Sequence, residues 1–545
     1  MKAAETSRHG KRKNKNEMPI VEQHKQQQEQ EYTNKPLFHT IEQNEAFIRR
    51  ELGGSPDVAI RKFYLGADGQ EEVMLVYVDG IVEEDSINRQ ILEPLQRRTE
   101  SQYKGGAATD DSLQVEQINI LTLKNKLVSI SVLEEVEDWA KCFKYLFLCG
   151  CIIFTSGTNK AIFAKVSVTA GRSIEEPTTE MTVRGPREGF TESLFVNMSL
   201  LRKKIRSPKL WSEAWTIGEV TQTPVSLIYI KGLADETILG TLRERLDSID
   251  IDGILETNYI EELIMDQKWT LFPTVINNER PDTVAASLLE GRVAIMVDGS
   301  PFALIMPVSL NSFFQAAEDY YQRYDIATFL RVLRFVSFSI ALLMPSLYVA
   351  IIGYHQEMIP TQLLLKLAAQ REGVPFPAYL EAFLMEFVFE ILREAVLRMP
   401  IAAGNTVSIV GGLVIGQSIV EAGIVSPAVV IVVSFTAIAS FVSPAYNLGI
   451  AARLIRFILL LASSTLGFYG ISMVIILLLL HLAHLRSIGM PYLKPFAPFF
   501  SSDMKDTFVR APLWKMQKRP QMLAEENSQR EDVQMPKEEH SGGQT

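Results

Sequence analysis

The sequence predicts an α/β cytoplasmic region of two related lobes followed by an all-α multi-span membrane domain. Four long uncharged stretches follow residue 334, and the first of them is residues 335–354. Each is at least as long as the roughly 20 residues with which a helix crosses a bilayer core. Residues 1–31 are rich in Lys, Gln and Glu and contain no apolar segment of the signal-peptide kind. We therefore expect the long N-terminal region to remain in the cytoplasm.

Composition narrows the classes of function. The chain has 54 Lys and Arg against 64 Asp and Glu, and the net charge of -10 disfavours nucleic acid as the main partner. Cys142, Cys149 and Cys151 share one apolar stretch, so we expect them to be reduced and packed in a core. The phosphate-loop, zinc-protease and nucleophile-elbow motifs are absent. We expect no enzyme, no cofactor and no metal, although His481 and His484 could share one helix face.

Six segments follow from the changes in composition along the chain. A disordered tail is expected at 1–35, an N-terminal α/β lobe at 36–170, a linker with a helix at 171–215 and a second α/β lobe at 216–327. The transmembrane domain covers 328–486 and includes an amphipathic helix at 381–399. Residues 487–545 are expected to form a cytoplasmic C-terminal segment that ends in a second disordered tail.

The two lobes are predicted from a repeated pattern of apolar strands. Residues 73–80 and 225–232 each form an apolar run that ends at a glycine turn, and a helical stretch follows each run. A hairpin pattern comes later in both halves, at 150–163 and 291–304, with turn residues at its centre. Short apolar strands also resemble one another by chance, but the matching order favours a duplication.

The predicted number of membrane spans is four, with five or six as alternatives. Uncharged runs at 399–420, 422–452 and 457–480 follow the first one. Basic residues before the first run and after the last one place both ends of the domain on the cytoplasmic side, which favours an even number of spans. Arg453 and Arg456 precede the last run and would then lie outside or be buried, against the charge rule.

The amphipathic helix at 381–399 carries the candidate site. At 100° per residue, three glutamates fall on one face at spacings of four, together with two phenylalanines and a leucine. In a symmetric oligomer each glutamate would become a ring of carboxylates that attracts cations, and the apolar side chains would form rings that gate by dewetting. The candidate pore-lining residues are Phe383, Glu386, Phe387, Glu390, Glu394 and Leu397.

Two other interpretations of this helix stay open. It could lie on the membrane surface with its charges in water. It could also sit inside the bundle, with its glutamates paired to Arg331, Arg334, Arg393 or Arg453.

The next stretch of the chain is rich in small residues. Gly412 and Gly416 form a G-x-x-x-G pattern. Because glycines let helix backbones approach one another, we expect these two residues to be helix-packing positions.

Several short stretches, taken together, are specific to one family. Within residues 140–510 they are EPTTE at 176–180, VRGP at 183–186, NERPD at 278–282, GRVAI at 291–295, DGSPF at 298–302, DYY at 319–321, PFP at 375–377, and the patterns at 381–386, 390–395 and 411–417. With these stretches the chain resembles the A subunits of GerA-type nutrient germinant receptors of endospore-forming bacteria.

This resemblance implies a multi-pass receptor subunit of the spore inner membrane, with its N-terminal region and C-terminus on the spore core side. It implies a transporter-like B subunit, which holds the nutrient, and a lipoprotein C subunit as partners. It further implies a homo-oligomeric, pentamer-like ring that passes monovalent cations across the lipid when nutrient binds. A paralogue class of the stage V sporulation AF type, which amplifies ion release, stays an alternative, as does a membrane scaffold for receptor assembly.

Overall fold

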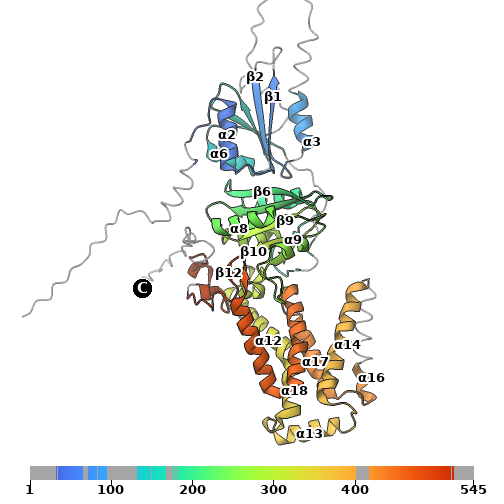
Figure 1. Ribbon diagram of the computed structural model, residues 1–545. Helices are drawn as coiled ribbons and strands as arrows, with labels where there is room; N and C mark the ends of the chain where they lie inside the picture. The colour runs from blue at the N-terminus through green and yellow to red at the C-terminus, as the bar shows by residue number, and fades with distance from the viewer. Residues whose placement is uncertain are drawn as a thin grey trace, which may run out of the picture. The chain divides into compact units, whose positions relative to one another are not determined.

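The computed structural model describes residues 32, 35–65, 71–82, 84–94, 132–148, 150–166, 176–177, 180, 182–400, 416–501, 503–516 and 518–520. Most of the two predicted tails, together with Cys149 and Gly412, lies outside these residues. The chain divides into two units, of which the first ends at Gly171 apart from short returns of the chain, and the second holds most of the rest (Figure 1).

The first unit is a five-stranded antiparallel sheet with the order β1-β2-β4-β5-β3, against which helices α2 and α6 pack. Trp139 at the start of α6 is buried and lies 4.4 Å from the Phe47 ring of α2, which joins the two helices over the sheet. Cys142 and Cys151 are free and buried in this core, as predicted. The elements are α2 (Ile41–Glu51), β1 (Val58–Leu65), β2 (Glu71–Val78), α3 (Glu84–Ile87), a π-helical turn (Asn88–Leu92), β3 (Leu133–Val136), α6 (Trp139–Leu146), β4 (Gly150–Thr155) and β5 (Ala161–Lys165).

The second unit begins with a lobe that repeats this topology. Its sheet has the order β6-β7-β9-β10-β8, which is the order of the first sheet shifted by five strands, so the predicted duplication is confirmed. Strands β9 and β10 are buried throughout, because helices and neighbouring strands cover them. The elements are α7 (Leu194–Lys204), β6 (Leu210–Ile217), β7 (Thr223–Ile230), α8 (Glu236–Asp247), α9 (Thr257–Ile264), β8 (Ile276–Asn278), α10 (Pro281–Leu289), β9 (Val293–Val297) and β10 (Ala303–Met306).

The boundaries of this lobe differ from those expected. Helix α7 packs on α10, and β6 begins inside the range predicted as a linker. The described part of that linker is therefore built largely into the second unit.

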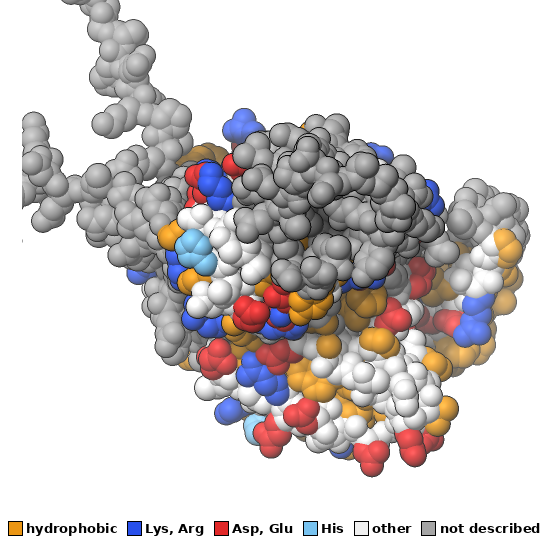
Figure 2. Space-filling view, turned by 90° about the horizontal axis from the view of Figure 1, so that it is seen from above, with side chains coloured by type: hydrophobic (Ala, Val, Ile, Leu, Met, Phe, Trp, Pro, Cys, Tyr) orange, Lys and Arg blue, Asp and Glu red, His pale blue; other side chains and the backbone are white. Residues whose placement is uncertain are grey.

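Figure 2 shows one face of the molecule, on which acidic and basic side chains are intermixed among the described residues.

A bundle of helices follows the second lobe in the same unit. Two of its described helices, α12 and α18, are long and apolar enough to cross a membrane by length and composition, and α17 is a shorter apolar helix. Figure 1 shows α13 at the end of the bundle away from the second sheet and α14 at its side. The helices are α11 (Glu318–Tyr321), α12 (Tyr324–Tyr354), α13 (Thr361–Arg371), α14 (Ala378–Arg398), α16 (Gly416–Glu421), α17 (Pro427–Ser440) and α18 (Tyr446–His484), and the short strands β11 (Arg486–Ser487) and β12 (Met490–Pro491) come after them.

Helix α18 is a hairpin of two arms, so the prediction of one span at 457–480 is wrong. Gly467 has φ 59° and ψ -136°, outside the helical region. Before it, Gly449 lies beside Phe338 of α12, and the Ser464 carbonyl accepts a hydrogen bond from Tyr354 at the far end of α12. After it, the chain returns to the lobe, where His481 is 3.0 Å from the Thr270 hydroxyl.

The run predicted at 422–452 is also divided. It contains α17, a break after Ser440 and the start of the first arm of α18. Helices α14 and α17 run parallel, because Glu381 near the start of α14 accepts from the Ser426 amide before α17, while Arg393 donates to Ser440 at the end of α17. The described helices thus make five passes along the bundle: α12, α14, α17 and the two arms of α18.

The turn at Gly467 generates a testable prediction. A methyl group at this position would lie 3.0 Å from Tyr354 and His355, in a backbone conformation that costs other residues about 1–3 kcal/mol. We expect Gly467→Ala to lower the midpoint of thermal unfolding of the purified chain in detergent. Gly449→Ala is the matched control, because a methyl group there meets nothing within 4 Å and sits in a helix. Equal midpoints for Gly467→Ala and wild type would contradict the hairpin.

Candidate functional site

Helix α14 holds all six predicted pore residues, which share one face by spacing, and the structure divides them by burial. The helix starts at Ala378, directly after Pro377, three residues earlier than predicted. Glu386 is fully buried and Glu390 is mostly buried, both toward α18. Phe383, Phe387, Glu394 and Leu397 are exposed. The acidic stripe is therefore not one continuous surface in this chain.

Glu386 and Glu390 of α14 meet Arg393 of the same helix and Arg453 and Arg456 of α18, and we call these five residues the ionic cluster. Arg456 lies 3.0 Å from a Glu386 oxygen and 3.1 Å from a Glu390 oxygen. Arg453 lies 2.9 Å from the other Glu390 oxygen. Arg393 lies 3.6 Å from Glu390 and donates to the Ser440 hydroxyl at 2.8 Å. The cluster ties α14 to α17 and α18.

The pairing agrees in part with the bundle interpretation of this helix. Arg393 and Arg453 are partners as proposed, whereas Arg331 and Arg334 lie elsewhere. Arg456 was not predicted as a partner, although it lies one turn after Arg453 on the same helix. The conflict of these two arginines with the charge rule has a physical explanation, because both are neutralised by glutamates inside the bundle rather than placed in water.

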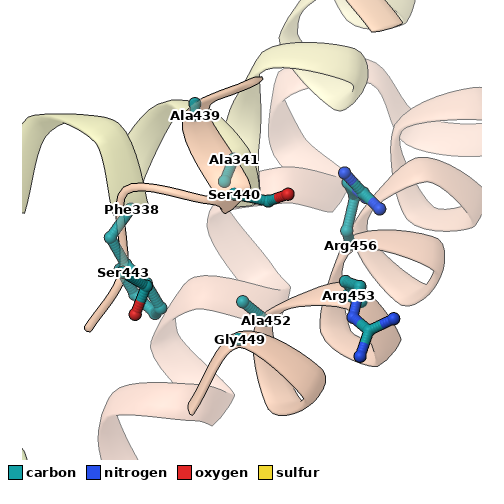
Figure 3. Close-up of a pocket in the computed structure, with 9 residues that line it drawn as sticks. All are labelled: Phe338, Ala341, Ala439, Ser440, Ser443, Gly449, Ala452, Arg453 and Arg456. Carbon is teal, nitrogen blue, oxygen red and sulfur yellow. The ribbon is translucent and has the colours of Figure 1, made fainter. Parts of the chain in front are cut away.

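A small hollow lies against this cluster (Figure 3). Its walls come from α12, α17, the turn that follows α17 and the first arm of α18. Figure 3 shows the guanidinium groups of Arg453 and Arg456 on one side of the hollow, with the small side chains of Ala341 and Ser440 beside them. The remaining lining residues are Phe338, Ala439, Ser443, Gly449 and Ala452. The hollow is where helices with small residues meet, and its charged groups are those of the ionic cluster.

The exposed candidates on α14 make few contacts within the part of the chain that the structure describes. Phe387 is 55% exposed, and the Glu394 side chain is 61% exposed with Arg398 as its partner at 2.6 Å. Leu397 is exposed to the same extent as Glu394. Phe383 alone among the exposed candidates has a ring contact, with Phe457 at 5.6 Å.

Gly416 begins α16, and an added methyl group there would meet nothing within 4 Å.

A second buried group of charges joins the lobe to α12, and we call it the junction: Asp319, Arg331, Arg334 and Asp506. Asp319 of α11 receives hydrogen bonds from Arg331 at 3.1 Å and from Arg334 at 2.7 Å. Arg331 also donates to Asp506 at 2.8 Å, and Asp319 and Arg331 are fully buried. The junction therefore connects the end of the lobe, the first turns of α12 and the C-terminal segment.

Motifs far apart in the sequence meet beside the junction. Arg280 of the NERPD stretch is buried and donates to Asp282 and to the carbonyls of Glu180 and Pro186. Tyr321 of the DYY stretch donates to Asp282. Gly185 has φ 138°, and a methyl group there would lie 2.7 Å from the Tyr321 ring. Four of the family-specific stretches, EPTTE, VRGP, NERPD and DYY, therefore share a structural role, which is to hold the segment before α7 against α10 and α11.

Glu180 is the polar contact between this segment and β8. Its carboxylate accepts two hydrogen bonds from the Asn278 amide, at 2.7 and 2.9 Å. Burial raises the pKa of the Glu180 carboxyl to about 7, against the opposing effect of the Arg280 guanidinium. This group therefore changes charge near neutral pH.

The junction generates a prediction about stability. Asp319→Asn removes the shared anion of two buried arginines, and breaking a buried ion pair in this way costs about 3–5 kcal/mol. We expect a large fall in the unfolding midpoint of the full chain in detergent. Asp325→Asn is the control with the same chemistry, because the Arg323–Asp325 pair is exposed and such pairs contribute about 0–1 kcal/mol. Equal effects of the two substitutions would show that the junction does not support the fold.

Comparisons with known proteins agree with these motifs. The model of the Bacillus/Clostridium GerA spore germination protein family matches residues 46–522. Spore germination protein KA of Bacillus subtilis (strain 168) is 46% identical over 492 residues, which cover 90% of this chain and 88% of that protein. Spore germination protein GerLA of Bacillus cereus is 39% identical over 481 residues, which cover 88% and 95%.

A solved structure also matches the chain. It is the crystal structure of the N-terminal domain of the A subunit of the Bacillus megaterium spore germinant receptor GerK3, with 33% sequence identity and a TM-score of 0.37. The match covers 50% of this chain and 96% of that chain. The extent and identity of the sequence matches confirm the resemblance, and the chain belongs to the GerA family of spore germination proteins, the family of germinant receptor A subunits.

Proposed function

We propose that this protein is the A subunit of a nutrient-gated cation channel that triggers germination from the spore inner membrane. Its partners in this proposal are the transporter-like B subunit, which binds the nutrient, the lipoprotein C subunit, and further copies of the chain in a ring. Membership of the GerA family supports the germination role. The exposed surface of α14 in the bundle supports the channel.

The exposed surface of α14 is the observation that carries the channel proposal. It presents Glu394 and Arg398 among large apolar side chains, on a helix at the side of an apolar bundle. Charged groups facing lipid are costly, so a face of this composition within a membrane domain favours contact with water or with another subunit. In a ring of copies, Glu394 supplies carboxylates that attract cations, and Phe387 and Leu397 form apolar constrictions.

Glu386 and Glu390 have a different place in this mechanism. In the described chain they neutralise arginines and hold α14 against α18. They reach the ion path only when α14 rotates or tilts and these pairs are exchanged for others. Nutrient binding in a partner can drive such a movement only through contacts that differ between the closed and the open state.

The proposed membrane orientation rests on the two ends of the bundle. Helix α12 leaves the second lobe at the junction, and the second arm of α18 returns to the same lobe at Thr270. Both ends therefore lie on one side. With the N-terminal region on the spore core side, the C-terminus lies there as well.

Removing the proposed constriction gives a test. We expect spores that carry Phe387→Ala to release cations without nutrient, because a smaller side chain weakens dewetting of the closed path. Ile431→Ala is the matched control, since Ile431 of α17 is 69% exposed but lies outside α14. Cation release is measured in dormant spores with equal amounts of the protein. If Phe387→Ala spores stay as dormant as the control, α14 does not line the closed path through this residue.

A further inference from the structure

Two segments outside the apolar helices expose large apolar side chains. The loop after α9 exposes Trp269 by 94%, together with Leu271. The C-terminal segment after β12 exposes Phe499, Val509 and Leu513. Large apolar side chains that are exposed close together can mark an interaction surface, and Trp is enriched where an apolar and a wet environment meet.

The loop after α9 lies at the lobe end of α18. Thr270, next to Trp269, is 3.0 Å from the His481 ring, and the Phe272 ring centroid is 6.3 Å from that of His481. His481 directly follows the exposed apolar side chains of the second arm of α18, which end with Leu480. Trp269 is therefore held where the apolar surface of this arm stops.

The C-terminal segment lies at the lobe end of α12. Phe508 packs on Phe335, with ring centroids 4.6 Å apart, and the Arg510 amide donates to the Thr328 hydroxyl at 3.2 Å. Phe335 is the first residue of the uncharged run of α12, directly after Arg334 of the junction. The exposed Val509 therefore lies where the apolar surface of α12 begins.

We propose that these two segments form a collar that inserts into the membrane–water interface on the lobe side of the bundle. The proposal rests on the membrane placement of α12 and α18 given above. Both segments sit at a boundary between apolar helix surface and charged lobe, and aromatic side chains favour that depth of a bilayer. Exposed lysines accompany them, namely Lys268, Lys505 and Lys515, and they match the negative charge of anionic headgroups. The ligand is thus a lipid surface with anionic phospholipid.

The depth of Trp269 in a bilayer tests the collar. The full chain, with its native cysteines replaced by alanine, carries a fluorophore at Trp269→Cys and is reconstituted into vesicles of phosphatidylcholine and phosphatidylglycerol. Some of the lipids carry a nitroxide, placed near the headgroup in one set of vesicles and deep in the acyl chain in another. Val220→Cys is the matched control, because Val220 is 78% exposed in the turn between β6 and β7 of the same lobe. Leu477→Cys, on the exposed side of α18, reports whether the bundle spans the bilayer.

We expect the nitroxide to quench the label at Trp269 at least about twofold more than the label at Val220, as an interfacial position requires. Quenching at Leu477 but not at Trp269, with nitroxides placed at both shallow and deep positions, would overturn the collar and leave the membrane placement intact. Quenching at neither position would overturn the placement and the collar together. Crosslinking of Trp269→Cys to a second copy in place of quenching would assign the surface to a subunit contact and overturn the lipid proposal.

Discussion

Opposite charges buried between apolar helices are the constraint on which the rest of the bundle depends. Glu386 and Arg456 are both fully buried, and neither could stay charged there alone without a cost of several kcal/mol. Their attraction sets which face of α14 turns toward α18. Glu394 and Leu397 share the face of Glu386 by spacing, but they lie beyond the buried residues of α14, all of which are in its first half, and so they remain exposed.

The same chemistry recurs where the bundle meets the lobe. Arg331 and Arg334 in the first turns of α12 donate to Asp319. Arg280 donates to the carbonyl of Pro186 in the segment before α7. Because α12 also lines the hollow beside Arg453 and Arg456, one helix touches both groups of charges. Movement of α12 would alter both groups of charges, so this helix physically connects the lobe to α14. Coupling in the energetic sense requires that the helix has two arrangements that both ends favour differently.

Local sequence patterns predicted the helices and strands of this protein better than they predicted which side chains pair with one another. The central strands were predictable because burial on both faces leaves an apolar run ended by a glycine turn, and α14 because prolines delimit it. The reversal at Gly467 was missed, since a single glycine in a long apolar run looks the same in a continuous span. The pairing of Arg456 with Glu386 was missed because it depends on how helices 70 residues apart pack. The division of the acidic stripe follows from that pairing and was equally hidden.

The most direct test of the channel is the effect of a neutral side chain at Glu394, the acidic candidate that is exposed. Cation release after nutrient addition is compared between spores carrying Glu394→Gln, spores carrying Glu421→Gln in α16 and wild type, at equal protein levels. A carboxylate ring at Glu394 predicts slower release or a changed preference among cations for Glu394→Gln, with Glu421→Gln like wild type. If Glu394→Gln spores release the same cations at the wild-type rate, this face of α14 does not line the ion path.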